Sequence, residues 1–190
     1  KVYIENDANA AAKGEATYGA AKGYKDSLFI TIGTGVGGGI IIDGKIYTGF
    51  NFSGAELGHM VIVKDGEACS CGRNGCMECY ASATGLIKLT KAKMLENKDS
   101  VMWELCGGNI DEVNGKTSFD ALRAGDKAGI AVVNEYIEYL ACGIVNFINI
   151  FQPEVLSIGG GICKEGETLL APIREIVSKE QYSRHSDKQT

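Results

Sequence analysis

The chain has 190 residues, of which 45% are hydrophobic and 23% charged, a globular composition with enough material for one substantial core. Its 19 Lys and Arg residues are outnumbered by 24 Asp and Glu, and the basic residues are scattered, which argues against a nucleic-acid-binding surface. No uncharged apolar run approaches the roughly 18 residues that a membrane helix needs. We therefore expect one domain over residues 1–190 with no membrane contact.

The first third of the chain has short apolar runs separated by turn residues, a pattern typical of strands. An Ala-rich helix is expected over residues 8–18, so that Asn6 and Asp7 lie where a strand passes into a helix. The pair Asp43-Gly44 predicts a tight hairpin. The predicted strands cover residues 2–5, 27–32, 39–42, 45–47 and 60–63.

From Ser82 onward the apolar residues recur mainly at helical spacing. A buried strand is expected over residues 155–158, with a turn over 159–162. Strands mixed with helices predict an α/β layered domain. The long apolar helix is typical of a core element, although a homodimer interface would explain it equally well. The predicted helices cover residues 86–95, 101–106, a segment after Ser118, 126–151 and 167–180.

The glycine-rich run 33–39 lies between two predicted strands. Glycines there allow successive backbone N–H groups to point at an anion such as a phosphate. The run is not a P-loop, and no helix follows it as in a dinucleotide-binding loop. A glycine-rich hairpin without a ligand is the alternative.

Acidic and imidazole side chains add candidate polar contacts. Asp7, at a strand end, could accept the proton of a hydroxyl that attacks a phosphoryl group, or it could simply cap the following helix. Glu56 and His59 could hydrogen-bond a polyhydroxy ligand, or lie in an ordinary solvated loop.

The cysteines give the sharpest signal. Cys69, Cys71 and Cys76 are closely spaced, and with His59 they form a Cys3His set typical of a structural zinc site. Cys79 competes for the fourth position, and free thiols are the alternative to a metal. The clustering fits a reducing cytoplasm better than a disulfide framework. The remaining three cysteines are expected to be plain buried residues: Cys106, Cys142 and Cys163.

Several motifs, taken in order, resemble the ROK family of glucokinase-like sugar kinases and sugar-responsive regulators. The resemblance covers nearly the whole chain, and motifs in order are far more specific than any one alone. The motifs are Glu5-Asn6-Asp7-Ala8-Asn9-Ala10, Gly33-Thr34-Gly35-Val36-Gly37-Gly38-Gly39, Glu56-Leu57-Gly58-His59, Cys69-Ser70-Cys71-Gly72-Arg73-Asn74-Gly75-Cys76-Met77-Glu78 and Gly159-Gly160-Gly161-Ile162.

The resemblance implies the actin-like ATPase (ribonuclease H-like) fold, with this chain as the C-terminal lobe carrying an inserted zinc-binding loop. It implies phosphorylation of a hexose, glucose by default, by ATP with Mg2+. The cytoplasmic location is expected from the cysteines, and the homodimer from the long apolar helix, for which core packing is the alternative. Asp7 would be the catalytic base. The sugar-binding residues would be Asn6, Glu56, His59 and Glu78. The nucleotide-binding residues would be Gly33, Thr34 and Gly35 at the phosphates and Gly159, Gly160 and Gly161 near the adenosine. The zinc ligands would be His59, Cys69, Cys71 and Cys76.

One departure is the missing Asp-x-Gly-Gly-Thr-type phosphate turn of the family's N-terminal lobe. We therefore expect the chain to be a piece of a longer protein and inactive when isolated. Two other function classes stay open, a sugar-responsive repressor and a zinc-stabilised interaction module. The presence of Asp7 and Thr34 favours the enzyme, because a repressor needs neither.

Overall fold

The computed structural model describes residues 5–190, so the strand predicted over residues 2–5 lies outside the described residues except for Glu5. Within residues 5–190, a mixed sheet of four strands forms the centre of the fold, in the order β3-β2-β1-β4. Strands β1 and β2 are antiparallel, as are β2 and β3, whereas β4 runs parallel to β1. The strands are β1 (Ser27–Ile32), β2 (Val36–Ile42), β3 (Lys45–Ile46) and β4 (Val155–Gly160).

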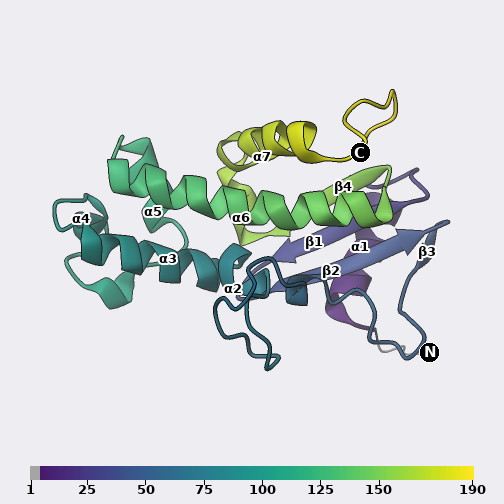
Figure 1. Cartoon of the computed structure of the whole chain (residues 1–190), viewed down its shortest axis with the longest axis horizontal. Coiled ribbons are helices and arrows are strands. Elements are labelled where there is room, and N and C mark those ends of the chain that lie inside the picture. Colours follow the sequence, from purple (N-terminus) through teal and green to yellow (C-terminus); the bar gives the residue numbers. More distant parts are fainter. Residues whose placement is uncertain (1–4) are drawn as a thin grey trace.

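Helices cover both faces of this sheet. Helix α1 packs on β1 and β2 from behind in Figure 1, and α6 crosses in front with α3 and α7 on either side of it. The helices are α1 (Asp7–Tyr18), α2 (Glu78–Ala81), α3 (Ala83–Glu96), α4 (Met102–Leu105), α5 (Thr117–Arg123), α6 (Lys127–Phe151) and α7 (Glu167–Glu180), with short 3-10 turns η1 (Leu57–His59), η2 (Ile110–Glu112) and η3 (Gly161–Glu165).

Strand β1 is buried on both faces because it lies between the two helical layers. Leu28, Ile30 and Ile32 belong to the main core cluster, whereas the alternate residue Phe29 lies outside that cluster although it is buried. This alternation follows the two-residue period of a strand. A nearly continuous apolar run is what burial of both faces requires.

The predicted core helix is confirmed as α6, whose apolar stripe is buried within the chain. Asp126 caps its N-terminus by accepting from the backbone N–H of Gly129 at 2.7 Å. The helix ends at Phe151, and its C-cap Gln152, which precedes Pro153, has φ of 44°. By length and composition α6 could cross a membrane, but 61% of its most apolar window is buried against the rest of the protein.

Three predictions from the glycine-rich and loop segments are wrong. Val36, Gly37 and Gly38 lie within β2 rather than in a turn, because they pair in register with the end of β1. Gly159 and Gly160 belong to β4 rather than to a turn, because they pair in register with Thr31 and Ile32.

Residues 60–63 form no strand, since only an isolated bridge joins Val61 to Cys76. The predicted hairpin at Asp43-Gly44 is confirmed, with positive φ at both turn residues.

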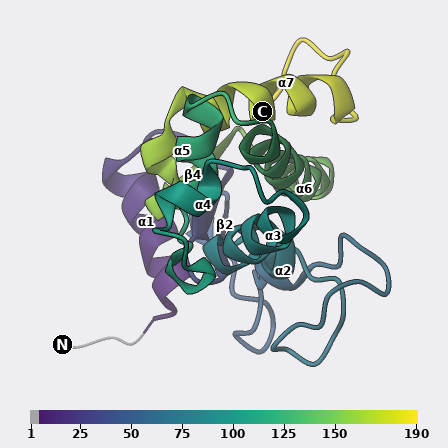
Figure 2. The ribbon, with the colours of Figure 1, turned by 90° about the vertical axis from the view of Figure 1, so that its left-hand side faces the viewer.

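The long connection between β3 and α2 extends away from the helices as loops (Figure 2). These loops carry two of the predicted site motifs, the one that begins at Glu56 and the one that begins at Cys69.

Candidate functional site

The carboxyl ends of β1 and β4 meet at one edge of the sheet. Since the strands are parallel and Ile32 pairs with Gly160, the glycine-rich segments that follow them in the chain, beginning at Gly33 and Gly161, leave the sheet side by side. The edge at the carboxyl ends of parallel strands is where open α/β sheets bind ligands. The topology therefore brings together the two predicted nucleotide-binding motifs.

The three predicted adenosine-side glycines differ in their surroundings. A Cβ on Gly159 would come 2.6 Å from the Phe29 ring, and Gly160 has φ of 100° with the Ile32 carbonyl against it. Both are therefore needed for packing whether or not a nucleotide binds. Gly161 begins η3 and has open space around its Cα.

Asn6 and Asp7 lie at the start of α1. The Asn6 side chain is the N-cap, with its Oδ1 accepting from the N–H groups of Ala8 at 3.0 Å and Asn9 at 3.1 Å. Asp7 is exposed in the first turn. The alternative that Asp7 is the helix cap is therefore wrong. Its Oδ1 accepts from the N–H of Ala8 at 2.8 Å, and the exposed carboxylate keeps its other oxygen for solvent or a ligand. A Cβ on Gly37 would come 3.3 Å from Ala8, which places this helix end beside β2.

The short helix η1 brings Glu56 and His59 to the same end of β2. A Cβ on Gly58 would come 2.1 Å from the Val36 carbonyl oxygen, so the two backbones touch. Glu56 is exposed at the start of η1, and its carbonyl accepts from the His59 N–H at 3.1 Å.

Glu78 reaches the same point from α2. Its Oε2 accepts a hydrogen bond from the backbone N–H of Val36 at 3.0 Å, and a Cβ on Gly35 would come 2.2 Å from that oxygen. Residues Gly35 to Gly37 are therefore the meeting point of α1, η1, α2 and the glycine-rich loop. The elements that carry the predicted catalytic, sugar-binding and phosphate-binding residues meet there.

His59, Cys69, Cys71 and Cys76 come together with all their ligand atoms within 4.8 Å of one another. The Cys71 and Cys76 sulfurs are 3.6 Å apart, and the His59 Nδ1 lies 3.5 Å from the Cys69 sulfur. Tetrahedral zinc with bonds of about 2.3 Å to sulfur and 2.0 Å to nitrogen would need separations of about 3.8 and 3.5 Å. The donor set and its spacing fit zinc.

The thiols of this cluster affect one another's ionisation. Burial raises the pKa of Cys76 to about 12, aided by its contacts with Cys71 and Cys69. Burial also acts on Cys69, but hydrogen bonds from Cys71, Cys76 and His59 outweigh it and lower the pKa of Cys69 to about 6. The Cys69 thiolate is therefore favoured at neutral pH, whereas ionisation of Cys76 would need a bound cation.

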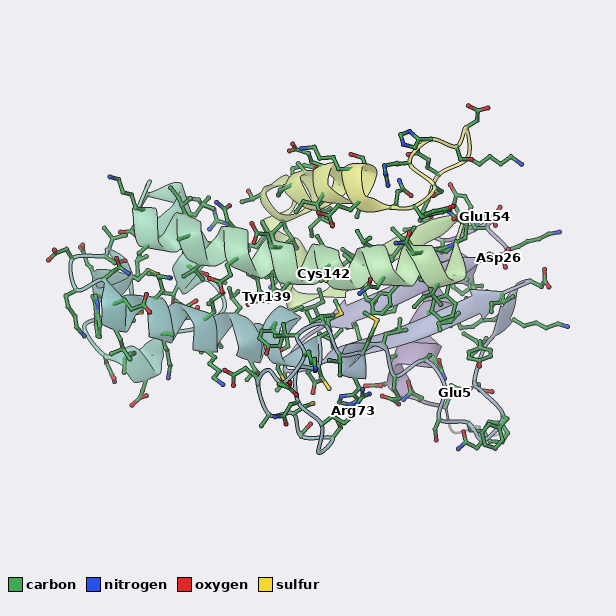
Figure 3. The ribbon with its side chains drawn as sticks, in the orientation of Figure 1. Glu5, Asp26, Arg73, Tyr139, Cys142 and Glu154 are labelled. Carbon is green, nitrogen blue, oxygen red and sulfur yellow. The ribbon has the colours of Figure 1, made fainter. Side chains whose placement is uncertain are left out.

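Cys79 lies outside the four-residue group. Its thiol donates to the Ala68 carbonyl at 3.6 Å, and burial raises its pKa to about 11. The side chain of Arg73, labelled in Figure 3 on the cysteine loop, donates from its guanidinium group to the His59 carbonyl at 3.4 Å. The expectation of three plainly buried cysteines holds for Cys106 only, because Cys142 and Cys163 are partly exposed.

Two residues that the sequence did not single out also contact the glycine-rich loop. The backbone N–H of Ala83 donates to the Gly33 carbonyl, and the Thr84 hydroxyl donates to the Thr34 carbonyl. Nothing in the sequence pattern signals these contacts, because they join residues about 50 positions apart.

An open cavity of about 600 Å³ lies elsewhere, between β4, α6 and α7. Its lining is mainly apolar and includes none of the predicted site residues. The polar groups that phosphoryl transfer needs lie instead around Gly35 to Gly37.

Comparison with known proteins gives a consistent result. The sequence model of the ROK family matches residues 1–189. A glucokinase from Thermotoga maritima is 40% identical over 177 residues, covering 93% of this chain and 56% of the relative. A xylose repressor from Caldicellulosiruptor bescii is 33% identical over 183 residues, covering 95% of this chain and 45% of the relative.

Among solved structures, a ROK family glucokinase from Streptomyces griseus, in complex with glucose and AMPPNP, superposes with a TM-score of 0.87 at 38% identity. The match covers 94% of this chain and 58% of that one. The chain thus spans about half the length of the relatives it matches. The predicted actin-like ATPase fold is confirmed by this likeness.

Proposed function

This chain belongs to the ROK family, and we propose that the protein containing it transfers a phosphoryl group from ATP to a hexose, with glucose as the first candidate. The observation that carries the proposal is the convergence of elements that carry an exposed carboxylate, several sugar-compatible groups and a glycine-rich loop around Gly35 to Gly37. Each component alone has an ordinary structural explanation. Their meeting from four separate elements supports a phosphoryl-transfer site.

Asp7 is the proposed general base. Its exposed carboxylate would take the proton of the sugar hydroxyl as that oxygen attacks the terminal phosphoryl group. Asn6, the helix cap, directly precedes Asp7 and fixes the backbone at the start of the helix. Since the Asn6 Oδ1 is engaged in capping, its Nδ2 is the atom left to donate to a sugar oxygen.

Sugar hydroxyls are neutral and need both donors and acceptors. Glu56 and Glu78 supply acceptors, and the Glu78 oxygen that is not bonded to Val36 remains for the ligand. A sugar epimer that leaves a carboxylate unpaired would be rejected by the cost of that unmade hydrogen bond.

Zinc held by His59, Cys69, Cys71 and Cys76 would stabilise the loop and fix the imidazole without taking part in the reaction. The Nδ1 atom of His59 faces the sulfurs. Its Nε2–H is therefore the group that would donate to a sugar hydroxyl. Loss of the cysteines should weaken sugar binding for this reason.

The nucleotide would lie across the carboxyl ends of β1 and β4. Backbone N–H groups of the loop Gly33, Thr34 and Gly35 would contact its phosphates, and Gly161 and its neighbours would lie near the adenosine. Mg2+ bound with ATP would offset charge on the phosphates. The open site is consistent with one lobe of a cleft whose other lobe lies outside this chain, and we expect the isolated chain to be inactive. A reducing cytoplasm and a homodimer belong to the same proposal.

A sugar-responsive repressor is the second candidate, because a xylose repressor also matches 95% of this chain. The test is phosphorylation of a hexose panel by the full-length protein with ATP, with zinc measured on the same sample. Turnover of one sugar would establish the kinase and its substrate together. Sugar binding and one zinc per chain without turnover would favour the repressor, and no sugar binding would leave only a zinc-stabilised interaction module.

A further inference from the structure

The glycine-rich loop after β1 is anchored on one side by the first two residues of α3. The Ala83 N–H donates to the Gly33 carbonyl at 2.9 Å, and the Thr84 hydroxyl donates to the Thr34 carbonyl at 2.8 Å. The first N–H groups of a helix have no partner within the helix. Here the Ala83 N–H finds one in the loop, while the Ser82 side chain caps Gly85.

These anchors decide which way the loop amides point. In a planar trans peptide, the carbonyl and the N–H that follows it point in opposite directions. Holding the carbonyls of Gly33 and Thr34 toward α3 therefore turns the N–H groups of Thr34 and Gly35 away from it. Within residues 5–190 those two N–H groups have no hydrogen-bond partner, whereas the next one, of Val36, is bonded to Glu78.

A loop of this composition needs such anchors. Glycine on both sides of Thr34 leaves the backbone a wide choice of φ and ψ, so the Thr34–Gly35 peptide could rotate at little cost. A rotated peptide would present a carbonyl oxygen where a phosphate needs a donor. The Thr84 hydroxyl opposes that rotation directly, because it bonds the carbonyl of the same peptide whose N–H is free.

We propose that Thr84 is a positioning residue for phosphate binding, which holds the Thr34–Gly35 peptide so that its N–H faces the nucleotide. The inference rests on the proposed kinase function. Thr84 itself does not touch the substrate. If Thr84 has an ordinary surface role, its loss should change only the stability of the protein. If Thr84 positions the loop for phosphate binding, its loss should weaken the use of ATP and leave hexose binding unchanged.

The test uses the full-length protein with the variants Thr84→Val, which removes the hydroxyl at nearly constant shape, and Thr84→Ser, which retains it. Thr17→Val is the matched control, because Thr17 is also exposed and its hydroxyl also donates to a backbone carbonyl, of Lys13 at 2.7 Å. We expect Thr84→Val to lower kcat/KM for ATP about three- to tenfold, the usual effect of one neutral hydrogen bond. The KM for hexose and the zinc content should stay unchanged, and Thr84→Ser and Thr17→Val should resemble the parent.

Equal losses for ATP and hexose in Thr84→Val, a lower melting temperature without a nucleotide defect, or no change at all would each overturn the positioning role. If the parent protein phosphorylates no hexose, the kinase proposal fails separately. ADP binding measured by calorimetry then tests the role of Thr84 separately. Weaker binding by Thr84→Val than by Thr84→Ser supports the positioning role, and equal or absent binding overturns it.

Discussion

The Glu78 carboxylate accepts a hydrogen bond from the backbone N–H of Val36 at 3.0 Å and thereby joins the segment after the cysteine cluster to the start of β2. Cys76 lies two residues before Glu78. The conformation of the cysteine loop therefore affects the position of this carboxylate through a short stretch of chain. The same oxygen would lie 2.2 Å from a Cβ on Gly35. Glycine at that position leaves room for the carboxylate.

Gly35→Ala should therefore displace the Glu78 side chain without unfolding the protein, because the clashing atom is the end of a flexible side chain. The displaced carboxylate would lose its hydrogen bond to the sugar, and because that bond involves a charged group we expect hexose affinity to fall roughly 10- to 100-fold. The melting temperature should change by only a few degrees. Isothermal titration with glucose and thermal unfolding of the full-length protein would measure both, and unchanged hexose affinity would contradict the assignment of Glu78 to the sugar site.

Cys71→Ser should purify without zinc, whereas Cys79→Ser should retain one zinc per chain, because Cys79 lies outside the four-residue group. Without the metal, the loop loses its cross-link, and we expect the free energy of unfolding to fall by a few kcal/mol. For a domain of this size each kcal/mol corresponds to roughly 2–4 °C in melting temperature. Metal analysis and thermal unfolding with and without a chelator test this. Equal zinc in both variants would exclude the ligand set.

Asp7→Asn should leave hexose affinity within about twofold of the parent while lowering kcat by roughly two to four powers of ten, the usual contribution of a general base. The amide has the same shape but cannot take up the proton. Asp43→Asn is the matched control, because Asp43 is an exposed turn residue with positive φ, which Asn tolerates. Steady-state kinetics on the full-length protein separate the two effects. Undiminished kcat in Asp7→Asn would move the base elsewhere.

Gly39→Ala should destabilise the protein by about 1–3 kcal/mol, because the added Cβ would lie 2.4 Å from the Ala12 Cβ and 3.0 Å from the Ala8 carbonyl oxygen. Gly14→Ala, in the same helix as those neighbours, should instead be neutral or stabilise by about 0.5–1 kcal/mol, since nothing lies within 4 Å and Ala favours a helix. Chemical denaturation of both variants tests the close approach of α1 to β2. Equal stability of the two would contradict it.

Asp126 gives a prediction about pH. Burial raises the pKa of Asp126, but hydrogen bonds from Gly129, Val101 and Ser100 outweigh it and hold the pKa below its ordinary value of 3.8. A lowered pKa in the folded state means that this contribution to stability is complete above pH 3.8 and disappears as the pH falls through the lowered value.

Asp126→Ala should accordingly cost about 1–2 kcal/mol at pH 7, as expected for loss of an N-cap. The difference between variant and parent should shrink once the pH falls well below 3.8. Urea unfolding at pH 7 and pH 3 would measure it, with Asp99→Ala as an exposed acidic control. A difference that is the same at both pH values would show that the carboxylate charge contributes nothing.

The sequence by itself determined the class of fold, the family and the identity of most candidate residues. The helical periodicity of 126–151 predicted α6 because so long an apolar stripe must be buried, and the Asp43-Gly44 pair predicted its hairpin because both turn residues need positive φ. The close spacing of the cysteines predicted their cluster because chain connectivity alone keeps such neighbours near each other.

Only the tertiary structure decided how these pieces meet. It assigned the helix cap to Asn6 rather than Asp7, excluded Cys79 from the metal group, and moved Gly37, Gly159 and Gly160 from predicted turns into strands. A glycine needed for close packing and one needed for a turn are the same letter, and only the neighbouring helix or strand distinguishes them. The contacts of Glu78 and Thr84 with the glycine-rich loop join residues far apart in the chain, and such contacts depend on the docking of whole elements, which no local pattern encodes.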